Sequence, residues 1–104
     1  MAFKVFVTDP AEQDIDEAFS YIAREDFSAA TKWYAELWSL IFSLKEMPSR
    51  FNVIQEVDEL GLQYRSVNHY SHRVIYRIDE STKAVFVVRI YHGSRKPLSV
   101  GDLE

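Results

Sequence analysis

Residues 72–95 of the 104-residue chain read HRVIYRIDESTKAVFVVRIYHGSR, a pattern that predicts two β-strands joined by a polar turn. In the first strand, residues 73–78, valine, tyrosine and isoleucine alternate with two arginines and a second isoleucine, so the two sets lie on opposite faces. The turn, residues 79–82, is rich in side chains that bond their own backbone. The second strand, residues 84–91, is β-branched and aromatic, which suits a strand covered on one side.

The hairpin is expected to present one apolar face and one face that carries Arg73, Arg77 and Arg89. Arginines on a sheet face are compatible with a plain solvated surface. They are equally compatible with a docking surface for an anionic group or a partner segment, because guanidinium groups match phosphates and carboxylates. We expect the three guanidinium groups to cluster on one side of the sheet, opposite the helices.

A strand at residues 3–7 precedes the first helix. Asp9 is a suitable N-cap for that helix, Pro10 fits its first position, and Glu12 completes a capping box. Apolar residues then recur at helical spacing through Ile22.

A polar break at residues 24–27 separates the first helix from a second one, for which Ser28 is the expected N-cap. The second helix should end before Pro48, because the residue before a proline is disfavoured in helical geometry. The short break predicts an antiparallel helical hairpin. The apolar stripe of the second helix comprises Ala30, Trp33, Tyr34, Leu37, Ile41 and Leu44, widened by Trp38, Leu40 and Phe42.

Residues 48–61 form a less regular connection, and residues 62–67 then read as a strand that enters the hairpin through a turn at residues 68–71. The expected order is thus strand, helix, helix and a three-stranded antiparallel meander. This order predicts one α+β domain over residues 1–104, with the helical hairpin packed on one face of the sheet and the other face at least partly open.

The composition limits the classes of protein to which the chain could belong. Its 47% hydrophobic content favours a folded domain, and the lack of cysteine excludes disulfides and thiolate metal sites. No membrane span or signal peptide is evident, so a cytoplasmic location is expected. Residues 1–61 hold five Lys/Arg against twelve Asp/Glu (−7), whereas residues 62–104 hold seven against four (+3). Any contact with nucleic acid should therefore involve residues 62–104.

The order of elements and several short motifs together resemble the RelE/ParE superfamily of bacterial type II toxin–antitoxin toxins, once also called plasmid stabilisation proteins. Each motif alone is degenerate, and their order and spacing over nearly the whole chain carry the likeness. The matching segments are Asp9–Ile15, Tyr21–Ala23, Ala30 with Trp33 and Tyr34, Leu44–Arg50, Tyr64–Val67, His72–Ile78 and Val87–Arg95.

The resemblance implies a small toxin that a cognate antitoxin neutralises, with which it could form a hetero-oligomer, and no cofactor. Two mechanisms divide the superfamily. RelE-like members cleave mRNA in the ribosomal A site, whereas ParE-like members are not nucleases and inhibit growth by binding DNA gyrase. Whether the chain is an enzyme therefore depends on its branch.

For a nuclease, the resemblance places Arg73 on the phosphate and His92 and Arg95 among the acid–base and cationic groups, with Glu56 as a weaker candidate base. His92 could equally be a structural hydrogen-bonding residue. His69 and His72 flank a turn without a carboxylate pattern, so no metal site is expected. The residues expected to bind antitoxin or target are Arg65, Arg73, Arg77, Arg89 and Tyr91, although Arg65 could instead pair with an acid of the first helix.

The connection before Leu62 lacks the lysine pair of RelE-like members, and the net charge of −4 departs from the strongly basic nucleases. The segment from His92 to Arg95 is closer to the ParE side. We therefore expect a ParE-like gyrase inhibitor, with a ribosome-dependent endonuclease as the alternative and a non-toxic binding module as a third. Trp33, Tyr34 and Trp38 are interpreted as helix-packing residues, with a gyrase-contact patch as the alternative.

Overall fold

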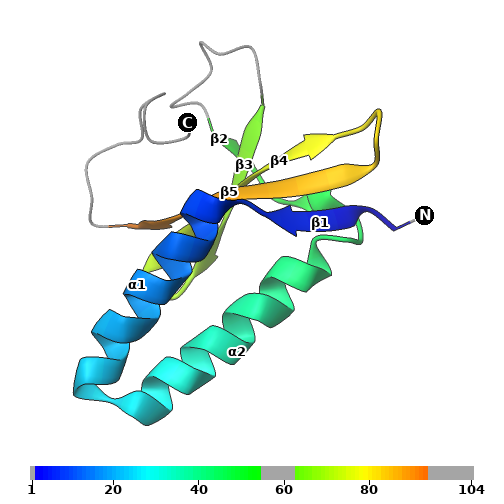
Figure 1. The fold of residues 1–104 in the computed structure, drawn as a ribbon. Helices are drawn as coiled ribbons and strands as arrows, with labels where there is room; N and C mark the ends of the chain where they lie inside the picture. The colour runs from blue at the N-terminus through cyan, green and yellow to red at the C-terminus, as the bar shows by residue number, and fades with distance from the viewer. Residues whose placement is uncertain (1, 55–62, 94–104) are drawn as a thin grey trace.

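The computed structural model describes residues 2–54 and 63–93, which form two helices on one side of a five-stranded sheet (Figure 1). The strand order across the sheet is β1-β5-β4-β3-β2, so the first and last strands of the described chain are neighbours. The elements in chain order are β1 (Lys4–Val7), α1 (Asp9–Glu25), α2 (Phe27–Ser43), the short 3-10 helix η1 (Pro48–Arg50), β2 (Val53–Ile54), β3 (Tyr64–His69), β4 (His72–Asp79) and β5 (Ala84–His92).

The meander predicted from the sequence is confirmed in β3, β4 and β5, which pair antiparallel. The first strand, β1, joins the other side of β5 in parallel, with Lys4 opposite Ala84 and Val7 opposite Val87. The two-residue strand β2 was not expected, because it lies in the segment predicted to be irregular, where it pairs antiparallel with β3. Its brevity explains why two residues of alternation gave no detectable signal.

Both predicted helices are present, but their N-caps differ from the expected ones. Thr8, not Asp9, caps α1: its Oγ1 accepts from the Ala11 amide at 3.4 Å and donates to the Val87 carbonyl at 3.1 Å. The Thr8 amide also donates to the Val87 carbonyl. Thr8 therefore ends β1 and starts α1, and the expected capping box of Asp9 and Glu12 is not formed.

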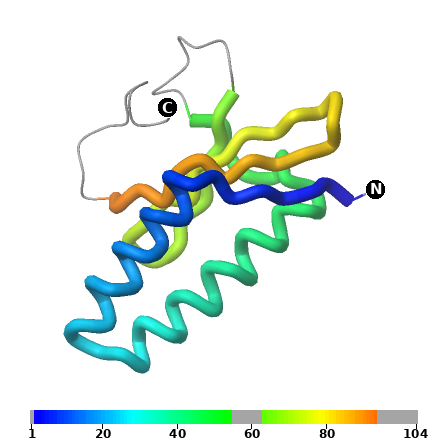
Figure 2. The backbone as a smooth tube through the Cα atoms, viewed as in Figure 1, coloured from blue at the N-terminus to red at the C-terminus, as the bar shows by residue number. Residues whose placement is uncertain are grey.

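The break between the helices is one residue long, shorter than the predicted break at residues 24–27. Asp26 is extended, with φ −155° and ψ 101°, and its Oδ1 accepts from the Ala29 amide at 3.0 Å. Asp26 is therefore the N-cap of α2, and Ser28, the expected cap, lies inside the helix. The hairpin turns sharply at Asp26, at the end far from β1 (Figure 2).

The main core lies between the helices and the sheet. Ala11 and Ile15 of α1 and Trp33, Leu37 and Ile41 of α2 pack there against Val74, Tyr76, Val85, Val87 and Ile90 of β4 and β5. Tyr34, predicted to belong to the apolar stripe of α2, is instead 39% exposed. The alternation predicted for β4 is confirmed, since Val74 and Tyr76 face the helices.

A second buried cluster lies on the other face of the sheet, built from Ile54, Tyr64, Ile75, Val88 and Tyr91. The expectation of an open face is thus correct only in part, because these residues are 0–9% exposed. Ile75, the isoleucine that alternates with the two arginines in β4, is fully buried. The face that carries arginines therefore has an apolar centre.

The two possible N-caps of α2 can be separated by mutation. Asp26→Ala should lower the free energy of unfolding by about 1 kcal/mol, because the Ala29 amide loses its acceptor at the start of the helix. Ser28→Ala should change it by less than about 0.5 kcal/mol, as is usual at exposed positions. Urea denaturation of both variants measures the difference. Equal losses, or a larger loss at Ser28, would contradict the assignment.

Candidate functional site

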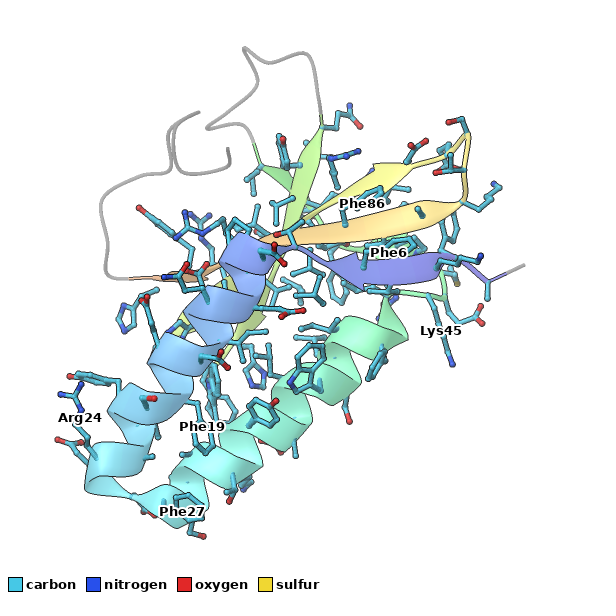
Figure 3. The ribbon with its side chains drawn as sticks, in the orientation of Figure 1. Phe6, Phe19, Arg24, Phe27, Lys45 and Phe86 are labelled. Carbon is cyan, nitrogen blue, oxygen red and sulfur yellow. The ribbon has the colours of Figure 1, made fainter. Side chains whose placement is uncertain are left out.

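Arg73 and Arg77 lie on the sheet face away from the helices, as predicted. Both lie two positions from Ile75 in β4, so their side chains are on the same face as that of Ile75. Each guanidinium lies near an aromatic ring of β5. The Arg77 guanidinium carbon is 4.4 Å from the centre of the Phe86 ring, and that of Arg73 is 6.0 Å from the centre of the Tyr91 ring. Phe86 in turn stacks on Phe6 of β1 at 5.4 Å (Figure 3). These contacts hold both cations along the surface of the sheet.

Arg89 lies opposite Ile75 in the register, but its guanidinium is bound by a carboxylate of α1. Its Nε donates to Oδ2 of Asp14 at 2.6 Å and its Nη2 donates to Oδ1 at 3.0 Å. Asp14 also accepts from the Ile90 amide at 2.9 Å. The two side chains are only 19% and 12% exposed. Arg89 thus fixes β5 to α1.

A bulge in β5 sets the register of Arg89. Ile75 of β4 is opposite Arg89, but the next residue, Tyr76, is opposite Val87, so Val88 is an extra residue in β5. Such an insertion bends and twists the strand and interrupts its alternation. Strict alternation from Val85 and Val87, which face the helices, would put Arg89 on the helix side, and the extra residue places it opposite Ile75 instead.

Arg65 lies on the helix side of the sheet, opposite Tyr76 in the register. Its Nη1 donates to the carbonyl groups of Ser49 at 3.1 Å and Phe51 at 2.6 Å. Tyr76 donates its hydroxyl proton to the Pro48 carbonyl at 2.5 Å. Arg65 therefore does not pair with an acid of α1. Together with Tyr76 it fixes the segment around η1 to the sheet.

The three histidines of the chain form a row across β3, β4 and β5. His69 is opposite His72, and His72 is opposite His92, with the last two rings 4.8 Å apart. His69 Nε2 donates to the Trp33 carbonyl at 3.0 Å, and the Trp33 ring packs against both His69 and His72. The sequence analysis did not predict this row. His72 lies two positions before Val74 in β4, so alternation already placed its side chain on the helix side.

The residues expected to form a nuclease centre do not converge among the described residues. Arg73 lies over Tyr91 on the face away from the helices, whereas His92 lies beside His72 on the helix side. Arg95 and Glu56, the remaining candidates, lie outside the described residues. Within residues 2–54 and 63–93, no group of three or more His, Asp or Glu side chains could hold a metal ion.

A cleft of about 1140 Å³ opens between the two helices and the β3–β4 turn. Its aromatic lining comes from Tyr21, Trp33, Tyr70 and the two neighbouring histidines, His72 and His92. Tyr70 has a φ of 56°, unusual for a bulky residue, and its hydroxyl donates to Glu36 of α2. That hydrogen bond to the carboxylate is the main reason why the pKa of Tyr70 is raised.

Charged groups of both signs surround the aromatic lining of the cleft. Asp16 and Glu17 of α1 supply negative charge, and Arg24 and Lys32 supply positive charge. A mixed lining of this kind suits recognition of a peptide segment, because it offers apolar contact together with partners for either sign of charge.

Residues 5–97 match the family model described as the ParE toxin of the type II toxin–antitoxin system parDE. The chain belongs to the ParE toxin family. It is therefore a toxin of a type II toxin–antitoxin system, within the RelE/ParE superfamily expected from its sequence.

Solved structures show the same fold. The RelBE2 toxin–antitoxin complex from Mycobacterium tuberculosis matches at 22% identity and a TM-score of 0.65, covering 88% of this chain and 92% of that one. The chromosomal ParDE system of P. aeruginosa matches at 14% and 0.67, covering 88% and 96%. The RelE–RelB complex of Pyrococcus horikoshii OT3 matches at 16% and 0.57, covering 92% and 100%. No curated protein matches the chain.

Within the described part of this ParE-family chain, no helix is long and apolar enough to cross a membrane.

The Asp14–Arg89 pair gives a testable stability effect. Asp14→Ala should lower the free energy of unfolding by about 3 kcal/mol, because it leaves the poorly exposed Arg89 guanidinium and the Ile90 amide without this acceptor. Asp16→Ala, two residues along α1 and exposed, is the matched control and should cost less than about 0.5 kcal/mol. Chemical denaturation that finds the two variants equally stable would contradict the structural role of Asp14.

Tyr76 should make stability depend on alkaline pH. Burial raises its pKa from 10.0 to about 12, with Arg65 and Arg50 opposing the shift. Because folding favours the neutral phenol, the stabilisation is complete below pH 10.0 and is lost as the pH rises towards about 12. Between those values the wild type should lose on the order of 2 kcal/mol more than Tyr76→Phe in urea unfolding. Tyr21→Phe, at an exposed tyrosine, should retain the wild-type pH dependence.

Proposed function

We propose that this toxin arrests growth by binding DNA gyrase, that it does not cleave mRNA, and that a cognate antitoxin neutralises it. The observation that carries the proposal is the separation of Arg73 from His92 by the sheet. Cleavage of RNA requires a base, an acid and phosphate-binding cations within hydrogen-bonding reach of one phosphate. Of the four candidate groups, Arg73, His92, Arg95 and Glu56, the first two lie on opposite faces of the sheet.

The electrostatics support the same proposal. The chain carries a net charge of −4. Proteins that act among phosphates usually have a strong basic excess, since most of their affinity comes from neutralising phosphate charge. Arg65 and Arg89, two of the five residues expected to bind a partner, already have partners inside the fold: the Ser49 and Phe51 carbonyls and Asp14. From that set, the guanidinium groups of Arg73 and Arg77 lie against Tyr91 and Phe86 on the sheet face away from the helices.

The antitoxin proposal has its own support. The solved structures from M. tuberculosis and P. horikoshii are complexes of a toxin with its antitoxin, and that from P. aeruginosa is of a toxin–antitoxin system. An antitoxin that folds onto this toxin would need exposed apolar and charged surface. The cleft between the helices and the β3–β4 turn supplies both.

Growth and gyrase assays test the proposal directly. Expression of the chain alone in bacteria should stop growth, and co-expression of the protein encoded beside it should restore growth. With purified gyrase, the full chain should inhibit supercoiling and trap cleavage complexes. An absence of any growth effect would favour the non-toxic binding module instead.

Programmed ribosomes provide the opposing test. The wild-type chain should leave mRNA in the A site intact under conditions in which a RelE nuclease, the positive control, cuts it. A-site cleavage by the wild type that Arg73→Ala or His92→Ala abolishes would overturn the proposal in favour of the endonuclease.

A further inference from the structure

The stretch from the end of α2 through η1, residues 43–51, is held by side-chain hydrogen bonds to its backbone, and we call it the η1 segment. Nη1 of Arg50 donates to the carbonyl groups of Glu46 at 2.5 Å and Met47 at 3.2 Å. Its Nη2 donates to Oγ of Ser43 at 2.9 Å. Arg50 therefore joins the second half of the η1 segment to the end of α2.

Three strands hold the η1 segment in place. The amide of Phe3, next to β1, donates to the Lys45 carbonyl at 2.8 Å. Arg65 of β3 and Tyr76 of β4 donate to carbonyl groups of residues 48–51. The backbone of the η1 segment is thus fixed by the fold before any partner binds.

Met47 stands out within this fixed segment. Its side chain is 73% exposed, more than any other large apolar side chain of the described residues. Its backbone is left-handed, with φ 46° and ψ 56°, a conformation that glycine adopts freely and methionine does not. Strained residues of this kind are concentrated at functional sites. The side chain of Met47 buries little, so glycine would serve the fold better, and a contact with a partner accounts for the methionine.

Basic side chains flank Met47 in the chain. Lys45 precedes it by two residues, Arg50 follows it by three, and both are exposed. Glu46 is the one acid of the η1 segment, which therefore carries +1 within residues 1–61, whose net charge is −7. Figure 3 shows Lys45 at the end of α2 that lies beside β1. A partner surface that accepts Met47 should thus be apolar at its centre and acidic around it.

We propose that the η1 segment is the part of the toxin that contacts DNA gyrase, with the Met47 side chain inserted into an apolar pocket of gyrase that acidic residues surround. This inference rests on the proposed function and names the contact through which the toxin would act. Methionine suits such a contact, because its flexible and polarizable side chain adapts to irregular apolar surfaces. The fixed backbone suits it as well, because little conformational entropy is then lost on binding.

The surface proposed for gyrase is separate from the one proposed for the antitoxin. The cleft between the helices and the β3–β4 turn is lined by residues of α1, α2, the turn and β5, and none of residues 43–51 is among them. A substitution in the η1 segment should therefore affect gyrase inhibition without affecting the antitoxin.

Met47→Gly tests the proposal without risk to the fold, because glycine removes the side chain and relieves the left-handed backbone. The variant should need about tenfold more protein than the wild type for half-inhibition of gyrase supercoiling. Its thermal midpoint, followed by circular dichroism, should equal or exceed that of the wild type. Lys83→Gly is the matched control, because Lys83 is exposed and has a φ of 55°, and it should leave inhibition unchanged.

Lys45→Glu tests the acidic character of the pocket. It should weaken inhibition by roughly threefold, and the effect should shrink as salt is added, because Lys45 is exposed. Lys32→Glu makes the same change of charge at an exposed position of α2 and should leave inhibition unchanged. Equal effects of the two substitutions would overturn the acidic character of the pocket.

The outcomes separate this inference from the gyrase proposal. If the wild type inhibits gyrase and Met47→Gly inhibits it equally well, the contact is overturned and the proposed function stands. If the wild type does not inhibit gyrase, both are overturned. The protein encoded beside the toxin should co-purify equally with the wild type and with Met47→Gly. Loss of that binding with unchanged inhibition would assign Met47 to the antitoxin and would overturn the inference.

Discussion

The contact on which the arrangement of this toxin most depends is the carboxylate of Asp14 at the bulge of β5. Three donors meet there, two from the Arg89 guanidinium and one from the Ile90 amide. Ile90 lies beyond the end of the β1–β5 pairing, which stops at Val87, and an unpaired buried amide would be costly. Asp14 satisfies that amide and, in the same contact, sets where α1 crosses β5. The position of the cleft beneath α1 follows from this crossing.

The contact between Asp14 and Arg89 could not be predicted from the sequence pattern. Alternation predicted the faces of β4 correctly through Val74, Ile75, Tyr76 and Arg77, since that strand is regular. It revealed neither the extra residue of β5, because nothing in a run of β-branched residues identifies it, nor the carboxylate of α1 that binds Arg89. The helix starts show a related limit. By residue type, either Thr8 or Asp9 could cap α1, and either Asp26 or Ser28 could cap α2. Which residue becomes the cap depends on where the preceding strand or helix ends.

The types of element and residue in the candidate site were largely predictable, whereas the positions of the side chains were less so. The family, the two-helix hairpin and the cationic character of β4 follow from residue patterns that local physics controls. The row of His69, His72 and His92 depends on the register of three strands, which the hairpin turns determine and the composition does not. The contacts of Arg65 within the fold were not predictable for another reason: they are with the backbone carbonyls of Ser49 and Phe51, and carbonyls are present in every sequence.

The way the chain distributes its polar chemistry bears on what it can do. Guanidinium groups that a catalyst would aim at one phosphate are used here for different tasks, with Arg89 on a carboxylate, Arg65 on carbonyls, and Arg73 and Arg77 over aromatic rings. His92 lies across the sheet from Arg73, beside His72 in a row packed against Trp33. Recognition of a protein surface tolerates such dispersion, because each contact adds area or charge independently. Bond cleavage does not, since its groups must act on the same few atoms at once. This dispersion supports the proposal that the toxin acts by contact with a protein target.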